Sequence, residues 1–170
     1  VAVIFGGKSA EHEVSVVTAH IPIIQALQAA GQYYIVPVYI SEEGRWYSDP
    51  AFINIAYFQK PGWRTMVAQL KPIDVSVNDG FTLVWPGLRT KRRKIDVVFP
   101  SMHGTYGEDG SLMGLLRLSG VPFVGCDMTA SAVAMDKVLT KQVTEAAGIP
   151  GVKYQWFSKA QFESNRQACI

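Results

Sequence analysis

Cysteine is scarce in this chain: Cys126 and Cys169 are the only two in 170 residues, and they lie far apart. No CxxC or HxxxH spacing occurs, so the sequence predicts neither a disulfide framework nor a metal site. A reducing, cytoplasmic setting fits this cysteine usage.

Charge of one sign and long apolar runs are also lacking. The formal net charge is +2, and the only basic run is KRRK at 91–94. We interpret this run as a solvated turn, because no aromatic residues are interleaved with it, and we expect no nucleic-acid partner. No apolar run reaches the length of a membrane span and no secretory leader is visible, so we expect no membrane partner. The chain opens at Val1 inside a strand-like run, so its true start is expected upstream.

Apolar residues make up 48% of the chain and charged residues 18%, which is typical of a globular protein with a core. Strands are expected at 1–5, 33–40, 94–100, 121–125 and 152–157, and helices at about 9–30, 62–70, 110–118, 129–147 and from 159 onward. A hairpin at 74–85 is predicted by its Asn-Asp-Gly turn. Strands that alternate with helices predict an α/β fold with an open, mainly parallel, Rossmann-like sheet flanked by helices.

The first helix has a simple apolar pattern. Its predicted buried stripe consists of Val14, Val17, Ile21, Ile24 and Leu27. Ser9 is the predicted N-cap, and Pro22 is expected to kink or split the helix.

The length allows one domain and the start of another. We predict an amino-terminal α/β domain at 1–127, followed at 128–170 by a connecting helix and an incomplete second domain. The GIPG at 148–151 marks the boundary after that helix.

The segment HGTYGEDGSLMG at 103–114 follows an expected strand, as does the glycine pair at 6–7. Ligands of open parallel sheets bind at the carboxyl ends of the strands. If the two strands are neighbours, Glu11 and His103 face one crevice. Gly104 and Gly107 would let the backbone approach a small ligand closely.

The residues alone leave several roles open. Glu11 is either a complement to the helix dipole or a ligand contact. Glu108 is either another such complement or a hydrogen-bond partner that orients His103. Asp109 is most simply an N-cap. The spacing of Lys137 and Lys141 favours a solvated helix face.

GGKS at 6–9 is no phosphate-binding P-loop, because Ala2 stands where that pattern needs glycine.

Three ordered segments carry a family resemblance. VAVIFGGKSAEHEVSVVTA (1–19), HGTYGEDGSLMG (103–114) and GVPFVGCDMTASAVAMDKVLTKQVTEAAGIP (120–150) resemble the amino-terminal portion of D-alanine–D-alanine ligases of the ATP-grasp type. The match covers nearly the whole chain and is poorest at 50–94. Met113 departs from the small or amide side chain that is common there.

The resemblance implies a substrate-binding (pre-ATP-grasp) domain followed by the start of an ATP-grasp domain. It implies a reaction in which ATP and Mg²⁺ phosphorylate one D-alanine and a second attacks the acyl phosphate, giving D-alanyl-D-alanine for peptidoglycan. It also implies a homodimer. Most ATP and Mg²⁺ ligands are expected beyond residue 170, so this chain is expected to be inactive alone.

The same resemblance assigns residues. Glu11 and His103 are implied as catalytic and substrate-binding residues, with Glu11 on the ammonium of the first D-alanine and Val14 beside its methyl group. Ser15 is implied to steady Glu11. Supporting roles are implied for Gly104, Gly107, Glu108 and Asp109. For Lys137 the resemblance implies contact with nucleotide phosphates, against the spacing argument.

Two competing interpretations remain. A Rossmann-type oxidoreductase would need a glycine fingerprint and an acidic residue at the end of the second strand. Ser41 and Glu42 match only the second requirement, and only weakly. A non-catalytic folding or dimerisation fragment is the other. The second substrate stays open between D-alanine, D-lactate and D-serine.

Overall fold

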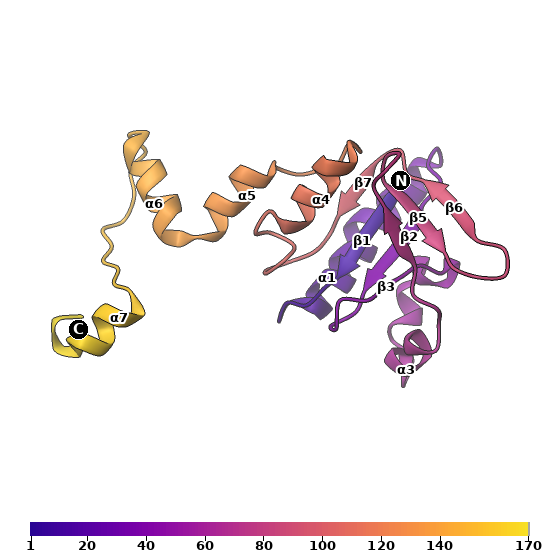
Figure 1. Ribbon diagram of the computed structural model, residues 1–170, viewed down its shortest axis with the longest axis horizontal. Coiled ribbons are helices and arrows are strands. Elements are labelled where there is room, and N and C mark those ends of the chain that lie inside the picture. Colours follow the sequence, from indigo (N-terminus) through magenta and orange to yellow (C-terminus); the bar gives the residue numbers. More distant parts are fainter. Residues whose placement is uncertain (170) are drawn as a thin grey trace. The chain divides into compact units, whose positions relative to one another are not determined.

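The computed structural model describes residues 1–169 and divides the chain into two compact units, Val1–Ala132 and Val133–Ile170 (Figure 1). The division falls inside a helix, α5 (Met128–Met135).

The first unit is built on a mixed, mostly parallel sheet with the strand order β3-β2-β1-β7. These strands are β1 (Ala2–Gly6), β2 (Val36–Ile40), β3 (Trp46–Tyr47) and β7 (Val98–Pro100). β1 runs parallel to β2 and β7, whereas β3 is antiparallel to β2. All five residues of β1 and of β2 are buried, as expected of strands covered on both faces. The predicted α/β class is therefore confirmed.

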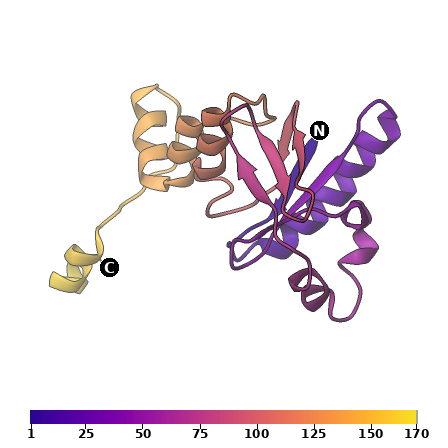
Figure 2. The same cartoon turned by 45° about the vertical axis from the view of Figure 1, so that its right-hand side comes forward.

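A continuous helical rod follows β1 and consists of α1 (His12–Thr18), a π-helical segment (Ala19–Ile24) and α2 (Gln25–Ala30) (Figure 2). Pro22 lies inside the π-helical segment. Because proline has no N–H to donate, the backbone hydrogen bonds switch there from α-helical to π-helical spacing. The rod continues without a break.

The predicted buried stripe of this rod is wrong for its first three members, because Val14, Val17 and Ile21 are 51%, 46% and 52% exposed. It is right for Ile24, which is buried, and Leu27 packs partly buried against the same core cluster. The other buried residues of α1 and the π-helical segment are His12, Ser15, Val16, Ala19 and His20. Three of these are polar and satisfy their hydrogen bonds internally, so an apolar pattern could not identify the inward face.

A second, antiparallel sheet joins β4 (Asp74–Ser76), β5 (Thr82–Trp85) and β6 (Lys91–Lys94). The predicted hairpin is confirmed as β4 and β5. The prediction that the basic run at 91–94 is a solvated turn is wrong. The run forms strand β6, because its backbone pairs with β5 although its side chains are charged. The strand predicted at 94–100 accordingly shrinks to β7.

The remaining elements of the first unit include two 3₁₀ segments (Pro50–Ile53 and Ile55–Tyr57), α3 (Trp63–Ala68) and α4 (Ser111–Ser119). The strand predicted at 121–125 is only a single bridge between Val98 and Phe123. Pro122 offers its carbonyl to the Val98 N–H but has no N–H of its own to extend the pairing.

The second unit contains α6 (Lys137–Ala146), α7 (Lys159–Ser164) and a 3₁₀ turn at Arg166–Cys169. The single helix predicted at 129–147 breaks at Asp136, whose carboxylate accepts from the N–H groups of Val138 and Leu139 and so starts α6. Residues 152–157 form no strand. Across residues 1–169, no helix combines the length and apolar character that crossing a membrane requires.

Candidate functional site

Two loops leave the same edge of the main sheet, because β1 and β7 are parallel neighbours. Buried Ser15 ties them together: its hydroxyl accepts from the Gly6 N–H at 2.7 Å and donates to the Ser101 carbonyl at 2.6 Å. The Ser101 N–H in turn donates to the Ile4 carbonyl at 2.7 Å. The Ser15 side chain, expected to steady Glu11, fixes the frame of the two loops by these bonds.

The Glu11 carboxylate lies against the backbone of the second loop. A Cβ atom built on Gly104 would be 2.6 Å from Glu11 Oε2 and 3.2 Å from Ser9 Cβ. Gly104 also has a φ of +67°, in the left-handed region that favours glycine. Glycine at this position therefore leaves room for the carboxylate, and Glu11 and His103 are brought to one rim.

A methionine packs between the two loops. A Cβ on Gly107 would be 2.6 Å from Met102 Cβ, and a Cβ on Gly7 would be 2.5 Å from Met102 Cε. Both loops therefore need glycine to close on the Met102 side chain, which is 8% exposed.

His103 is held from both sides of its ring. Its Nε2 lies 2.8 Å from the Thr18 hydroxyl, which lies 3.0 Å from the Val14 carbonyl and either accepts from the ring or donates to it. Nδ1 lies 3.8 Å from Glu108 Oε1, and Glu108 Oε2 accepts from the Gly104 N–H at 3.0 Å. Glu108 thus contacts both the histidine and the glycine beside it.

Asp109 organises the end of this loop. Its carboxylate accepts from the N–H groups of Tyr106 at 2.8 Å and Ser111 at 2.9 Å. Partial burial acts to raise the pKa of Asp109, but the hydrogen bonds from Ser111 and Tyr106 outweigh it and hold this pKa below its ordinary value. Tyr106 adopts a positive φ of 66°, which Asp109 stabilises. Asp109 is not the N-cap of α4, because Gly110 occupies that position.

The start of α1 also differs from the prediction. Glu11, not Ser9, precedes the first helical residue, and the Ser9 hydroxyl accepts from the Glu11 N–H at 3.2 Å.

Sequence reasoning missed His12 and Thr18. The buried His12 imidazole has Nδ1 at 2.6 Å from the Gly7 carbonyl and Nε2 at 2.9 Å from the Tyr39 hydroxyl. Since a carbonyl only accepts, Nδ1 carries the proton and Nε2 accepts from the phenol. Burial raises the pKa of Tyr39, which keeps that donor protonated. The position of His12 beside Glu11 in the sequence is the signal that could have pointed to it.

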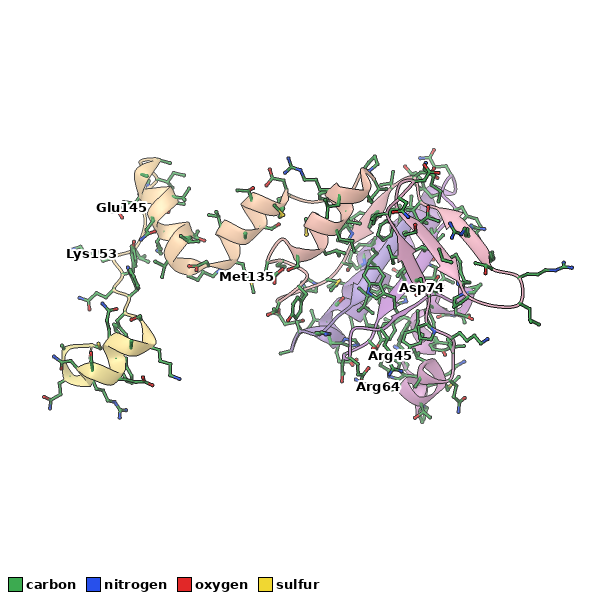
Figure 3. The ribbon with its side chains drawn as sticks, in the orientation of Figure 1. Arg45, Arg64, Asp74, Met135, Glu145 and Lys153 are labelled. Atoms are coloured by element: carbon green, nitrogen blue, oxygen red, sulfur yellow. The ribbon has the colours of Figure 1, made fainter. Side chains whose placement is uncertain are left out.

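His12, Glu13 and Glu42 place ligand-type atoms within 4.8 Å of one another. The Arg64 guanidinium contacts both carboxylates, Glu42 at 3.4 Å, and both His12 nitrogens are already engaged. Arg64 projects from α3 and is labelled in Figure 3. We therefore assign no metal to this cluster.

Neither Val14 nor Lys137 contributes its side chain to the contacts above. Val14 is on the exposed face of α1. Lys137 belongs to the second unit, where it is the first residue of α6 and its Nζ donates to the Ala134 carbonyl at 3.1 Å.

The fold defines an α/β domain of the open-sheet class, in which the loops after β1 and β7 converge at one edge. The family model described as "D-ala D-ala ligase N-terminus" matches residues 1–126. The chain therefore belongs to the D-alanine–D-alanine ligase family.

Relatives and solved structures agree with that assignment. The chain is 39% identical over 164 residues to the D-alanine–D-alanine ligase of Chlorobium phaeovibrioides, covering 89% of the chain and 42% of the relative. The ligase structure from Coxiella burnetii matches with a TM-score of 0.76 and 38% identity, over 93% of this chain and 44% of that one. VanG D-Ala:D-Ser ligase from Enterococcus faecalis matches with a TM-score of 0.75 and 34% identity, over 96% and 46%. The chain thus spans less than half the length of these proteins.

Proposed function

We propose that this chain is the amino-terminal part of an ATP-dependent ligase that joins two D-alanines, and that it supplies the subsite for the first. The observation that carries the proposal is the Glu11 carboxylate lying against Gly104, one residue from His103. The family membership supports the same assignment.

Glu11 is the group that would hold the ammonium of the substrate. Its side chain is exposed at the rim, and its carboxylate carries the charge that an ammonium needs. A charge-assisted hydrogen bond of this kind is among the stronger polar contacts in proteins.

His103 would position the same substrate. Its Nε2 is hydrogen-bonded to Thr18 and its Nδ1 faces Glu108, so the ring is held on both sides next to the loop that Glu11 contacts. Val14 is exposed on α1, about one helical turn after Glu11, and would lie against the substrate methyl group.

ATP would supply the phosphoryl group that activates the first D-alanine as an acyl phosphate. Lys137 fits a phosphate, because its ammonium is solvent-exposed at the start of α6. The acidic group formed by Glu13 and Glu42 does not fit Mg²⁺, since Arg64 already neutralises it, and no step is derived through the metal. We propose that the other ATP and Mg²⁺ ligands lie in the part of the ligase that this chain lacks. The chain alone should then release no ADP in a coupled assay, and measurable turnover would contradict this.

The Glu11 role is tested by Glu11→Gln in the full-length enzyme. Losing the charge-assisted bond should weaken binding of the first D-alanine by about 1.5–3 kcal/mol. This would be seen as a raised KM for D-alanine with little change in the KM for ATP. Glu13→Gln is the matched control, because Glu13 pairs with Arg64 and should leave the D-alanine KM unchanged. An unaltered D-alanine dependence in Glu11→Gln would refute the assignment.

We also propose a cytoplasmic homodimer that serves peptidoglycan synthesis. The exposed apolar side chains of Val17 and Ile21 on the helical rod support a second copy covering this face. Light scattering tests the dimer, and a strictly monomeric chain carrying these residues would remove this support.

A further inference from the structure

A cleft of the first unit lies at the amino end of β2 and beside β5 and β6. Figure 1 labels these three strands. Glu11 follows the carboxyl end of β1, which runs parallel to β2, so the two sites lie at opposite ends of the main sheet. This cleft has a volume of about 500 Å³. Its aromatic and cationic lining consists of Tyr33, Tyr34, Trp85, Lys91 and Arg93.

The two cations come from alternate positions of β6 and therefore share a face of the strand. The Lys91 ammonium lies 5.5 Å from the centroid of the Trp85 ring, and the Arg93 guanidinium carbon lies 4.2 Å from that of Tyr34.

None of the residues that line the cleft, all of them within residues 1–169, is acidic. Asp96 lines the adjoining hollow, and Asp49, between the lining residues Ser48 and Pro50 in the sequence, accepts from the Ala51 N–H at 2.8 Å. The side chains that line the cleft itself therefore carry only positive charge.

The aromatic walls are available for stacking. Tyr33 and Tyr34 are 46% and 68% exposed, so broad ring surfaces face solvent at the rim. The Trp85 indole is fixed by its Nε1–H, which donates to the Ser48 carbonyl at 3.0 Å. Aromatic faces held beside cations are the chemistry by which proteins recognise planar, negatively charged ligands.

We propose that this cleft binds a mononucleotide, with its base stacked on the tyrosine rings and its phosphate between Lys91 and Arg93. A guanidinium and an ammonium are the two side-chain groups suited to a phosphate. The basic run carries no aromatic residues of its own, but pairing with β5 brings Trp85 to it, and the fold adds Tyr33 and Tyr34 from a distant part of the sequence. This site is independent of the D-alanine subsite and of the phosphate role proposed for Lys137.

The test is a titration of AMP into the 170-residue chain, followed through the indole N–H resonance of Trp85 in NMR spectra. That resonance is assigned by its loss in Trp85→Phe. A saturable shift of the Trp85 signal is expected, with adenosine and inorganic phosphate each binding more weakly than AMP. Absence of a shift, or adenosine binding as tightly as AMP, would overturn the proposal.

Variants separate this site from general electrostatics. The double variant Lys91→Gln/Arg93→Gln should lower the affinity for AMP by about tenfold or more, since both phosphate contacts are lost. The double variant Arg89→Gln/Arg92→Gln removes the same charge from exposed positions outside the cleft and should leave the affinity unchanged. Lys137→Gln should also leave it unchanged, which separates this site from the proposed ATP contact. Equal losses in the two double variants, or loss in Lys137→Gln, would contradict the assignment.

Discussion

The two ends of the main sheet use polar side chains in opposite ways. At the carboxyl end, Ser15, His12 and Asp109 are committed to backbone groups of the two loops. At the amino end, Lys91 and Arg93 rest on aromatic rings and make no ion pair within the described chain. Directional hydrogen bonds fix a geometry, whereas contacts between cations and rings tolerate movement. Substitutions at the carboxyl end should therefore lower the free energy of unfolding strongly, and substitutions at the amino end should lower it only slightly.

The largest effect is expected from His12→Ala. Removing the imidazole leaves the buried Gly7 carbonyl and Tyr39 hydroxyl without their partner. Each unsatisfied buried group costs about 1–3 kcal/mol, so the free energy of unfolding should fall by about 2–6 kcal/mol. Chemical denaturation of the chain measures this. A loss below about 1 kcal/mol would show that water replaces the ring and that the loop is not fixed by it.

Comparing Gly104→Ala with Gly31→Ala separates the cost of a positive φ from the cost of a steric contact with Glu11. Gly104 and Gly31 have nearly the same φ, +67° and +68°, but a Cβ on Gly31 meets nothing within 4 Å. Gly31→Ala should therefore cost only the backbone strain, about 1–2 kcal/mol of unfolding free energy.

Gly104→Ala should cost that amount and also displace the Glu11 carboxylate, which raises the D-alanine KM of the full-length enzyme. Equal KM values in the two variants would break the proposed link between Gly104 and Glu11.

Asp109→Asn tests the loop through pH. The pKa of Asp109 is held below its ordinary value of 3.8, so its contribution to stability is present above that value and is lost as the pH falls through the lower, folded-state pKa. The wild-type chain should therefore lose more stability on acidification than Asp109→Asn does. At neutral pH the variant should be less stable by about 0.5–1.5 kcal/mol, because its side chain keeps only one acceptor oxygen. Unfolding curves measured from neutral to acidic pH check both statements, and parallel acid losses would contradict the first.

The smallest effect is expected at the amino end, from Arg93→Gln. Loss of its stacking on Tyr34 should lower the free energy of unfolding by about 0.5–1 kcal/mol. A loss as large as that of His12→Ala would overturn the contrast between the two ends of the sheet.

Local chemistry predicted much of the fold. The buried strands β1 and β2 and the hairpin of β4 and β5 follow from β-branched runs and from an Asn-Asp-Gly turn. Strand β6 could not be found in this way, because its Lys-Arg-Arg-Lys sequence has no apolar pattern and only pairing with β5 makes it a strand. The break before α6 depends on a cap that the side chain of Asp136 supplies in the middle of a helical pattern.

The candidate site was predictable only where motif and topology coincide. The meeting of the loops that carry Glu11 and His103 follows from the order of two parallel strands. The contacts that hold them do not, since Thr18 and His12 look like ordinary helix residues until the backbone is folded. The inward face of α1 was mispredicted for the same reason: its polar side chains are buried by partners from other elements.

Oxidation of Met102 would disturb this rim. Sulfoxide formation would add a polar oxygen near the end of a buried side chain, where a Cβ on Gly7 would lie only 2.5 Å from Cε. The loops would have to separate to admit that atom. Chemical damage at a residue that touches no substrate would then open the rim on which Glu11 and His103 meet, and a methionine sulfoxide reductase could restore it.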